Sequence, residues 1–126
     1  MGSINQNFTM FQGNDASLRF TIIDENDDAL DLTGGIVHWS LALNNLKKPA
    51  LIVKASDDVD PLVEITDAPG GVVTVTLIGD DTKTLSGGRY YHELELVDFE
   101  GNVSTLSTGH IILVPTLIKE PPEVFV

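Results

Sequence analysis

The sequence contains no cysteine, which excludes a disulfide framework, a thiolate zinc site and a cysteine nucleophile within these 126 residues. Positive charge is also scarce, with 7 Lys and Arg against 19 Asp and Glu and a formal net charge of −12. Nucleic acids and anionic membranes are bound by basic surfaces, so we expect neither as a partner. The first basic residue is Arg19 and no long apolar run follows Met1, so the sequence predicts neither a signal peptide nor a membrane-spanning segment.

The length of 126 residues suits one domain and is too short for two that each bury a core. Hydrophobic residues make up 42% of the chain, which argues against disorder of the whole chain. We find no internal repeat and no domain boundary. The sequence therefore predicts a single domain over residues 1–126, with its core at about residues 8–115 and a C-terminal arm at residues 116–126.

Apolar and polar residues alternate along several segments, which is the pattern of half-buried strands. Shorter runs at residues 9–12, 51–55 and 62–65 complete a set of seven or eight strands, and residues 79–86 could hold one helical turn capped by Asp80 or Asp81. Near the end, Ile112 and Val114 are as apolar as Ile111 and Leu113, so that strand is expected to be covered on both faces. The apolar faces are Leu18, Phe20 and Ile22; Val37, Trp39, Leu41 and Leu43; Val73, Val75 and Leu77; and Tyr90, His92, Leu94 and Leu96.

Two sheets with apolar faces must close on each other, which predicts an all-β antiparallel sandwich with Phe20, Trp39, Tyr90 and Leu94 in its core. Trp39 lies in the third long strand, where immunoglobulin-like sandwiches often bury a tryptophan. Tyr90 follows a turn in the manner of a tyrosine corner, with its hydroxyl bonded back to the preceding loop. These two residues favour the immunoglobulin-like form, and any other antiparallel sandwich or barrel stays open as the alternative.

Carboxylates and histidines are the residues that could hold a metal, and their spacing argues against it. Asp24, Asn26 and Asp28 have the spacing of a calcium loop, but Ala29 replaces its glycine and Gly35 its bidentate glutamate. We interpret this turn, and the one holding Asp57, Asp58 and Asp60, as solvated acidic loops. The three histidines, His38, His92 and His110, fall on three different expected strands, and we expect His92 to be a hydrogen-bonded core or boundary residue.

Catalytic patterns are equally weak, so we expect no enzyme and no cofactor. Ser86, Ser104 and Ser107 lie outside any G-x-S-x-G elbow, and no phosphate-binding loop is present. Glu93 and Glu95 share one face of an expected strand and could imitate the carboxylate pair of a glycosidase. Such pairs are normally supplied by separate strands across a groove, so a solvated sheet face is the simpler interpretation.

The C-terminal segment departs from the strand pattern. Pro121 and Pro122 favour an extended backbone, yet the chain ends in three apolar residues that water alone would cover poorly. Frayed ends and extended arms that dock on a neighbouring subunit both explain it, and the mixed polar and apolar segment at residues 4–8 has the same two explanations. If these are docking arms, the contact residues are Leu117, Ile118, Val124, Phe125 and Val126.

Several segments, in their order and spacing, resemble a family of small tailed-phage proteins. They are residues 8–15 (FTMFQGND), 30–34 (LDLTG) before a tryptophan-bearing strand, 65–67 (ITD), 71–77 (GVVTVTL) and 88–96 (GRYYHELEL). The pattern is similar to the immunoglobulin-like N-terminal domain of phage baseplate upper proteins and covers about residues 8–115.

The resemblance implies a structural component of a tailed-phage virion, assembled in the host cytoplasm and without an active site. Its partners would be other virion proteins, in multiple copies within a symmetric particle. Tail, baseplate, neck and capsid surface all remain open as its position. The alternative is a carbohydrate- or cell-surface-binding module, for which Trp39 and Tyr91 are the candidate aromatic contacts.

Overall fold

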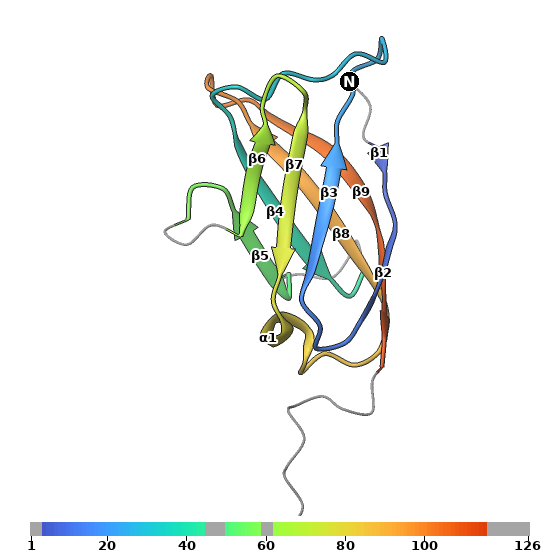
Figure 1. The fold of residues 1–126 in the computed structure, drawn as a ribbon. Coiled ribbons are helices and arrows are strands. Elements are labelled where there is room, and N and C mark those ends of the chain that lie inside the picture. The colour runs from blue at the N-terminus through green and yellow to red at the C-terminus, as the bar shows by residue number, and fades with distance from the viewer. Residues whose placement is uncertain (1–3, 45–49, 59–61, 116–126) are drawn as a thin grey trace, which may run out of the picture.

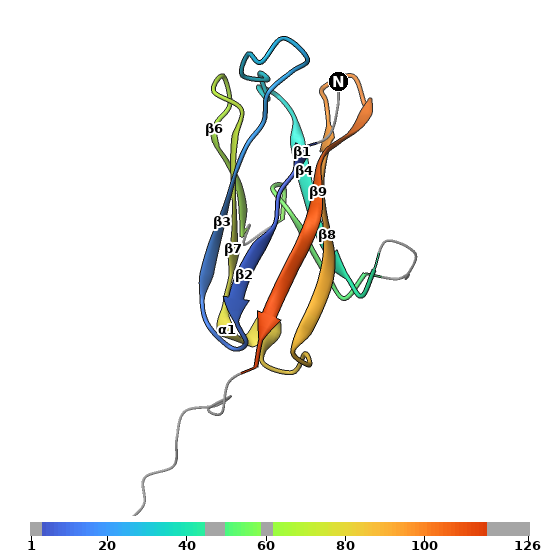
Figure 2. The same cartoon turned by 90° about the vertical axis from the view of Figure 1, so that its right-hand side faces the viewer.

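The computed structural model describes residues 4–44, 50–58 and 62–115, which form two β-sheets packed face to face (Figures 1 and 2). The smaller sheet has the order β3-β7-β6, and the larger has the order β1-β9-β8-β4-β5 with β2 also paired to β9. The elements are β1 (Ile4–Asn5), β2 (Phe8–Phe11), β3 (Ala16–Thr21), β4 (Ile36–Ala42), β5 (Ile52–Ala55), β6 (Val63–Asp67), β7 (Val72–Leu77), α1 (Gly79–Thr82), β8 (Gly88–Val97) and β9 (Val103–Val114).

The predicted fold class is confirmed: the chain is an all-β sandwich. Apart from the two-residue β1, the described residues form eight strands. Strand β7 lies at the centre of the smaller sheet, and β4, β8 and β9 are consecutive neighbours in the larger one. Within the described ranges, no helix has the length and apolar character needed to cross a bilayer.

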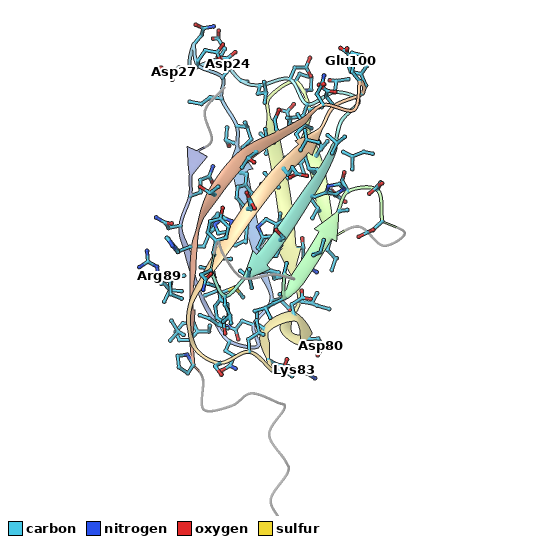
Figure 3. All side chains as sticks on the ribbon, turned by 180° about the vertical axis from the view of Figure 1, so that it is seen from behind. Asp24, Asp27, Asp80, Lys83, Arg89 and Glu100 are labelled. Carbon is cyan, nitrogen blue, oxygen red and sulfur yellow. The ribbon has the colours of Figure 1, made fainter. Side chains whose placement is uncertain are left out.

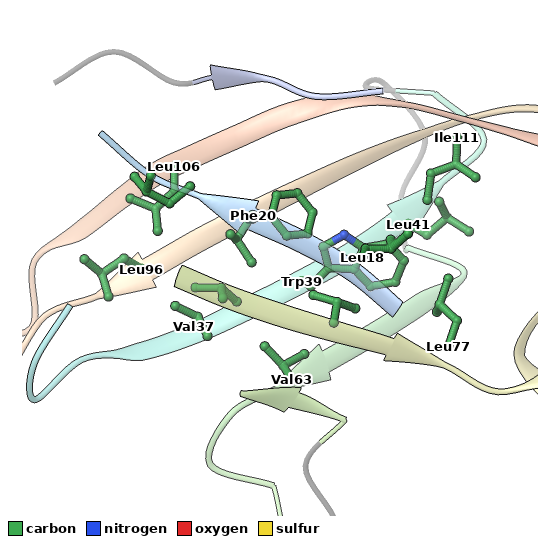
Figure 4. Close-up of a cluster of buried hydrophobic side chains, with 14 of the residues drawn as sticks. Leu18, Phe20, Val37, Trp39, Leu41, Val63, Leu77, Leu96, Leu106 and Ile111 are labelled. Atoms are coloured by element: carbon green, nitrogen blue, oxygen red, sulfur yellow. The ribbon is translucent and has the colours of Figure 1, made fainter. Parts of the chain in front are cut away.

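The core lies between the two sheets and is built from the alternating apolar faces (Figure 4). Phe20 from the smaller sheet and Trp39 and Leu94 from the larger one are fully buried, and Tyr90 is 5% exposed. Complete burial of a large apolar side chain contributes on the order of 1.5–3 kcal/mol, so these residues are a major source of stability.

The connection between β7 and β8 closes one end of the sandwich. The Tyr90 hydroxyl donates to the Ser86 carbonyl at 2.6 Å, which is the tyrosine-corner bond expected from the sequence. In α1 the N-cap residue is Ile78 rather than the expected Asp80 or Asp81, and Asp81, at the third helical position, accepts the Ile78 N–H at 2.8 Å. The same carboxylate pairs with the Lys54 ammonium at 3.1 Å, which ties α1 to the edge strand β5.

Two details of the expected core are wrong. Leu43 follows the end of β4 and is 48% exposed, so it does not continue the apolar face of that strand. Ile112 is 40% exposed, so β9 is not covered on both faces there. The reason lies in the pairing: β2 lies beside β9 in the plane of the sheet, and so it covers the edge of β9 rather than its outer face.

Strands β1 and β2 form a paired edge rather than the extended N-terminal arm that the sequence predicts. Strands β1 and β2 both run parallel to β9, with Ile4 opposite Ser107 and Phe8 opposite Ile111 (Figure 2). This pairing shields one side of β9, whose other side pairs with β8. The predicted C-terminal arm, residues 116–126, lies outside the described residues.

Candidate functional site

The outer face of the larger sheet carries a row of polar side chains, most of them half-buried. Because alternate residues of a strand point to opposite faces, the residues between those of the core face outward. From β8 these include Arg89, Tyr91, Glu93 and Glu95, and from β9 they include Thr108 and His110. Register places Tyr91 directly opposite His110 and Glu93 opposite Thr108.

A shallow hollow of about 380 Å³ lies on this outer face. An Nη of Arg89 lies 3.0 Å from Nδ1 of His110. Since arginine only donates, His110 Nδ1 must accept, which leaves an N–H on its Nε2. The residues lining the hollow are Leu43, Asn44, Arg89, Tyr91, Thr108, Gly109 and His110.

The hollow combines an aromatic ring with hydrogen-bonding groups of both kinds. The pKa of Tyr91 is raised, because its hydroxyl is partly buried and lies beside Glu93, with which it shares a hydrogen bond. Tyr91 therefore stays neutral at physiological pH. Arg89 and His110 supply donors, and Asn44 and Thr108 can donate or accept. Such a set suits a polar ligand with a flat apolar face.

The carboxylates considered for glycoside hydrolysis are not brought together across a groove. Glu93 lies between Ser40 and Thr108, and Glu95 lies between His38 and Thr105. Neither faces a second carboxylate on a neighbouring strand. Nδ1 of His38 approaches the Glu95 carboxylate only to 3.8 Å, and both side chains are about 40% exposed. This arrangement agrees with a solvated sheet face.

The acidic loops use their carboxylates to hold their own backbone. Asp24 Oδ1 accepts the amides of Asn26 at 2.8 Å and Asp28 at 3.1 Å. Asp58 Oδ2 accepts the Ala55 amide at 3.2 Å, whereas Asp60 lies outside the described residues. Over the part of the chain that the structure describes, no group of three or more His, Asp or Glu residues is placed to hold a metal ion.

The three histidines occupy unrelated environments. His38 and His110 lie on the outer face, whereas His92 is fully buried in the core. Its Nδ1 lies 3.4 Å from the Trp39 indole nitrogen and its Nε2 lies 2.7 Å from the Gln6 carbonyl oxygen. Burial is the main cause that lowers the pKa of His92 below the ordinary value. His92 is thus the hydrogen-bonded core residue that the sequence predicts.

The sequence-predicted contact residues Leu117, Ile118, Val124, Phe125 and Val126 lie outside the described residues. Sequence reasoning missed an exposed apolar pair close to where β9 ends. Phe11 is 54% exposed and Ile112 is 40% exposed, and both point away from the core. Register places Thr9 beside Ile112 and Phe11 beside Val114, so the two side chains are diagonal neighbours. A second exposed apolar pair, Phe99 and Val103, lies at the other end of β9.

Comparison with known protein families and with curated proteins finds no match to this chain. Its proposed role therefore depends on its own residues and on the resemblance described above.

Proposed function

We propose that this chain is a non-enzymatic structural protein of a tailed-bacteriophage virion, which docks on neighbouring virion subunits. It is present in multiple copies in a symmetric particle that is assembled in the host cytoplasm. The observation that carries the proposal is the agreement between the phage-like segments and the fold. Residues 8–15 contain β2 and the turn after it, residues 71–77 contain β7, and residues 88–96 form most of β8. An immunoglobulin-like sandwich is the fold that the resemblance implies.

The surface chemistry supports docking rather than catalysis. The chain carries a net charge of −12, which favours solubility before assembly. Phe11 and Ile112 nevertheless form an exposed apolar pair near Pro115, the last described residue. Residues 116–126 continue from this point and contain the predicted contact residues. We propose that this pair and the C-terminal segment together form the surface that contacts a neighbouring subunit.

Particle incorporation tests this function. Phage particles are assembled with the full-length chain, with a chain lacking residues 116–126, or with Phe11→Ser, and the chain is detected in purified particles. We expect full incorporation of the first and loss of the other two. Phe99→Ser is the matched control. Phe99 is 79% exposed, which is more than Phe11, and it lies at the other end of β9.

Folding of each variant is checked by its circular dichroism and urea midpoint, so that loss of incorporation is not mistaken for unfolding. Absence of the full-length chain from purified particles would overturn the virion role. Normal incorporation of both the truncated chain and Phe11→Ser would overturn the proposed docking surface.

The hollow on the outer face favours a second candidate function, carbohydrate or cell-surface binding. Tyr91 lines it together with Arg89 and His110, whereas Trp39 is fully buried and is not available to a ligand. A sugar ring could stack on Tyr91 and bond to the polar groups around it. We expect the NMR chemical shifts of Tyr91 and His110 to change when neutral or acidic monosaccharides are added. The change at His110 should be lost in Tyr91→Ala and kept in the control Phe99→Ala. No shift change with any of these sugars would argue against this function.

A further inference from the structure

Trp39, His92 and Gln6 form a hydrogen-bonded chain that connects the core to the N-terminal edge. The indole N–H of Trp39 can only donate, so Nδ1 of His92 accepts it at 3.4 Å. The proton of the neutral ring is therefore on Nε2, which donates to the Gln6 carbonyl at 2.7 Å. His92 is fully buried, and its neutral form satisfies both ring nitrogens.

The backbone around Gln6 is fitted closely onto β9. Gly109 is opposite His92 in the sheet, and a Cβ at this position would lie 1.8 Å from the Gln6 oxygen and 3.0 Å from His92 Nε2. Only glycine lets the Gln6 carbonyl reach the ring. Gln6 N–H also donates to the Thr108 carbonyl at 2.8 Å, and Asn7 Oδ1 accepts the His110 N–H at 2.9 Å.

The surroundings of His92 offer little compensation for a positive charge. The rings of Phe8 on β2, Phe20 on β3 and Trp39 on β4 lie 5.5, 5.8 and 6.2 Å from the imidazole. They can attract a cation weakly but cannot accept a hydrogen bond along the ring plane as a carboxylate does.

The titratable neighbours of His92 do not help either. On β9 the nearby titratable group is His110, and a positive charge on its ring would repel a positive charge on His92. On β8 itself, Tyr91 and Glu93 point to the opposite face of the sheet. Burial without an opposing charge lowers the pKa of His92, in agreement with the geometry.

We propose that His92 is an acid-sensitive latch that holds residues 4–7 on β9 when it is neutral and releases them when it is protonated. Protonation places an N–H on Nδ1 against the indole N–H of Trp39, so two donors face each other. The Gln6 carbonyl by itself favours the charged ring, but burial disfavours it more. Movement of residues 4–7 away from β9 lets water reach the Nε2 edge, because Gly109 has no side chain to block it, and hydration of the cation then outweighs the loss of the Gln6 bond. Phe8 and Met10 pack in the core and keep β2 in place, so the release is confined to the first residues.

Amide hydrogen exchange measured by NMR tests this latch. The reporters are the amides of Gln6 and His110. The references are Ile22 N–H, which donates to the Gly71 carbonyl, and Thr76 N–H, which donates to the Leu62 carbonyl, both in or next to the smaller sheet and away from His92. We expect the protection of the reporters, relative to the references, to fall between about pH 7.5 and about pH 5. The fall should be about tenfold for each unit by which the pKa of His92 is lower in the closed form than in the open form. An unchanged ratio would overturn the proposal.

Two variants separate the latch from general acid destabilisation. His92→Gln keeps a donor for the Gln6 carbonyl but cannot be protonated, so the pH dependence of the reporters should disappear. His38→Gln is the matched control, because His38 lies on the outer face, and it should keep the wild-type dependence. A His92→Gln protein that retains the full dependence would contradict the latch.

If His92→Gln does not fold, the wild-type protein still decides the question. The ring resonances of His92 and the exchange of the Gln6 amide should then change with the same pH midpoint. Different midpoints would overturn the proposal.

Discussion

Asp27 has a left-handed backbone conformation in the loop of residues 24–28. A second loop, residues 98–102, has the same hydrogen bonds, and there the corresponding residue is Gly101. In the loop of residues 24–28, the Asp24 N–H donates to the Asp28 carbonyl at 2.8 Å and the Asp27 N–H donates to the Asp24 carbonyl at 3.1 Å. In residues 98–102, the corresponding bonds are Asp98 N–H to Asn102 at 2.9 Å and Gly101 N–H to Asp98 at 2.9 Å. The fourth residue of each five-residue loop has a positive φ, which is 62° at Asp27 and 86° at Gly101.

This match predicts opposite effects for exchanging the two residues. A left-handed conformation costs a residue with a side chain about 1–2 kcal/mol, and somewhat less for Asp, which visits it more readily. The greater entropy of glycine in the unfolded chain offsets part of the gain. Asp27→Gly should therefore raise the free energy of unfolding by about 0.5–1 kcal/mol. Gly101→Asp should lower it by a similar amount, since a Cβ there would meet nothing within 4 Å and the backbone angle alone sets the cost.

Urea denaturation measures both effects. With an m-value on the order of 1.5 kcal/mol/M, each substitution shifts the midpoint by about 0.5 M in opposite directions. Asp27→Asn is the control for charge, because it removes the carboxylate but keeps a side chain that tolerates this conformation. A gain in Asp27→Gly that is no larger than that in Asp27→Asn would refute the conformational reasoning, as would a Gly101→Asp protein of unchanged stability.

Three further predictions concern buried polar groups. Tyr90→Phe removes the donor to the Ser86 carbonyl and should cost about 1 kcal/mol in urea unfolding, and an unchanged midpoint would show that the corner bond adds nothing. Asp81→Asn leaves Lys54 without its partner at 11% side-chain exposure, so a loss of about 1–3 kcal/mol is expected, with Asp80→Asn as the exposed control. Because the pKa of His92 is lowered on folding, stability should be complete above about pH 6.5 and fall as the pH drops below it; a midpoint that rises with acidification would contradict this.

Strand positions could be predicted because burial on one face leaves an alternating pattern in the sequence. Leu18, Phe20, Trp39 and Leu94 all occupy inward positions for this reason. The same rule fails at Leu43, because alternation of residue types continues past the point where β4 stops pairing with β8. Local pattern identifies a strand, whereas its end depends on the partner.

The outer-face hollow was harder to predict because it depends on register between strands. Counting back from the hairpin at residues 98–102, with Val97 opposite Val103, would place Tyr91 opposite Gly109 and turn His110 inward. A register shift after Leu94 makes Leu106 the extra residue and places Tyr91 opposite His110. The structure shows the shift in its burial pattern: Leu106 and Ile111 are both buried although they are five residues apart, which a regular strand does not allow. The sequence does not reveal it, because Ile112, six residues from Leu106, is apolar as well.

The parallel pairing of β1 and β2 with β9 has no local signature, because the paired residues lie about a hundred positions apart in the chain. Gly109 is the residue of the sequence that indicates this pairing. A glycine inside a strand often marks the close approach of another backbone, and here the Gln6 carbonyl is that neighbour.

Both acidic hairpin loops lie at the same end of the sandwich, where Asp24, Asp27 and Glu100 project into solvent (Figure 3). The opposite end carries Asp80 balanced by Lys83, which lies 3.0 Å away. The molecule therefore has an uneven electric field along its length. With a screening distance of about 8 Å at physiological salt, two copies that approach by their loop ends repel each other at close range. Head-on association of two copies through these loops is thereby disfavoured.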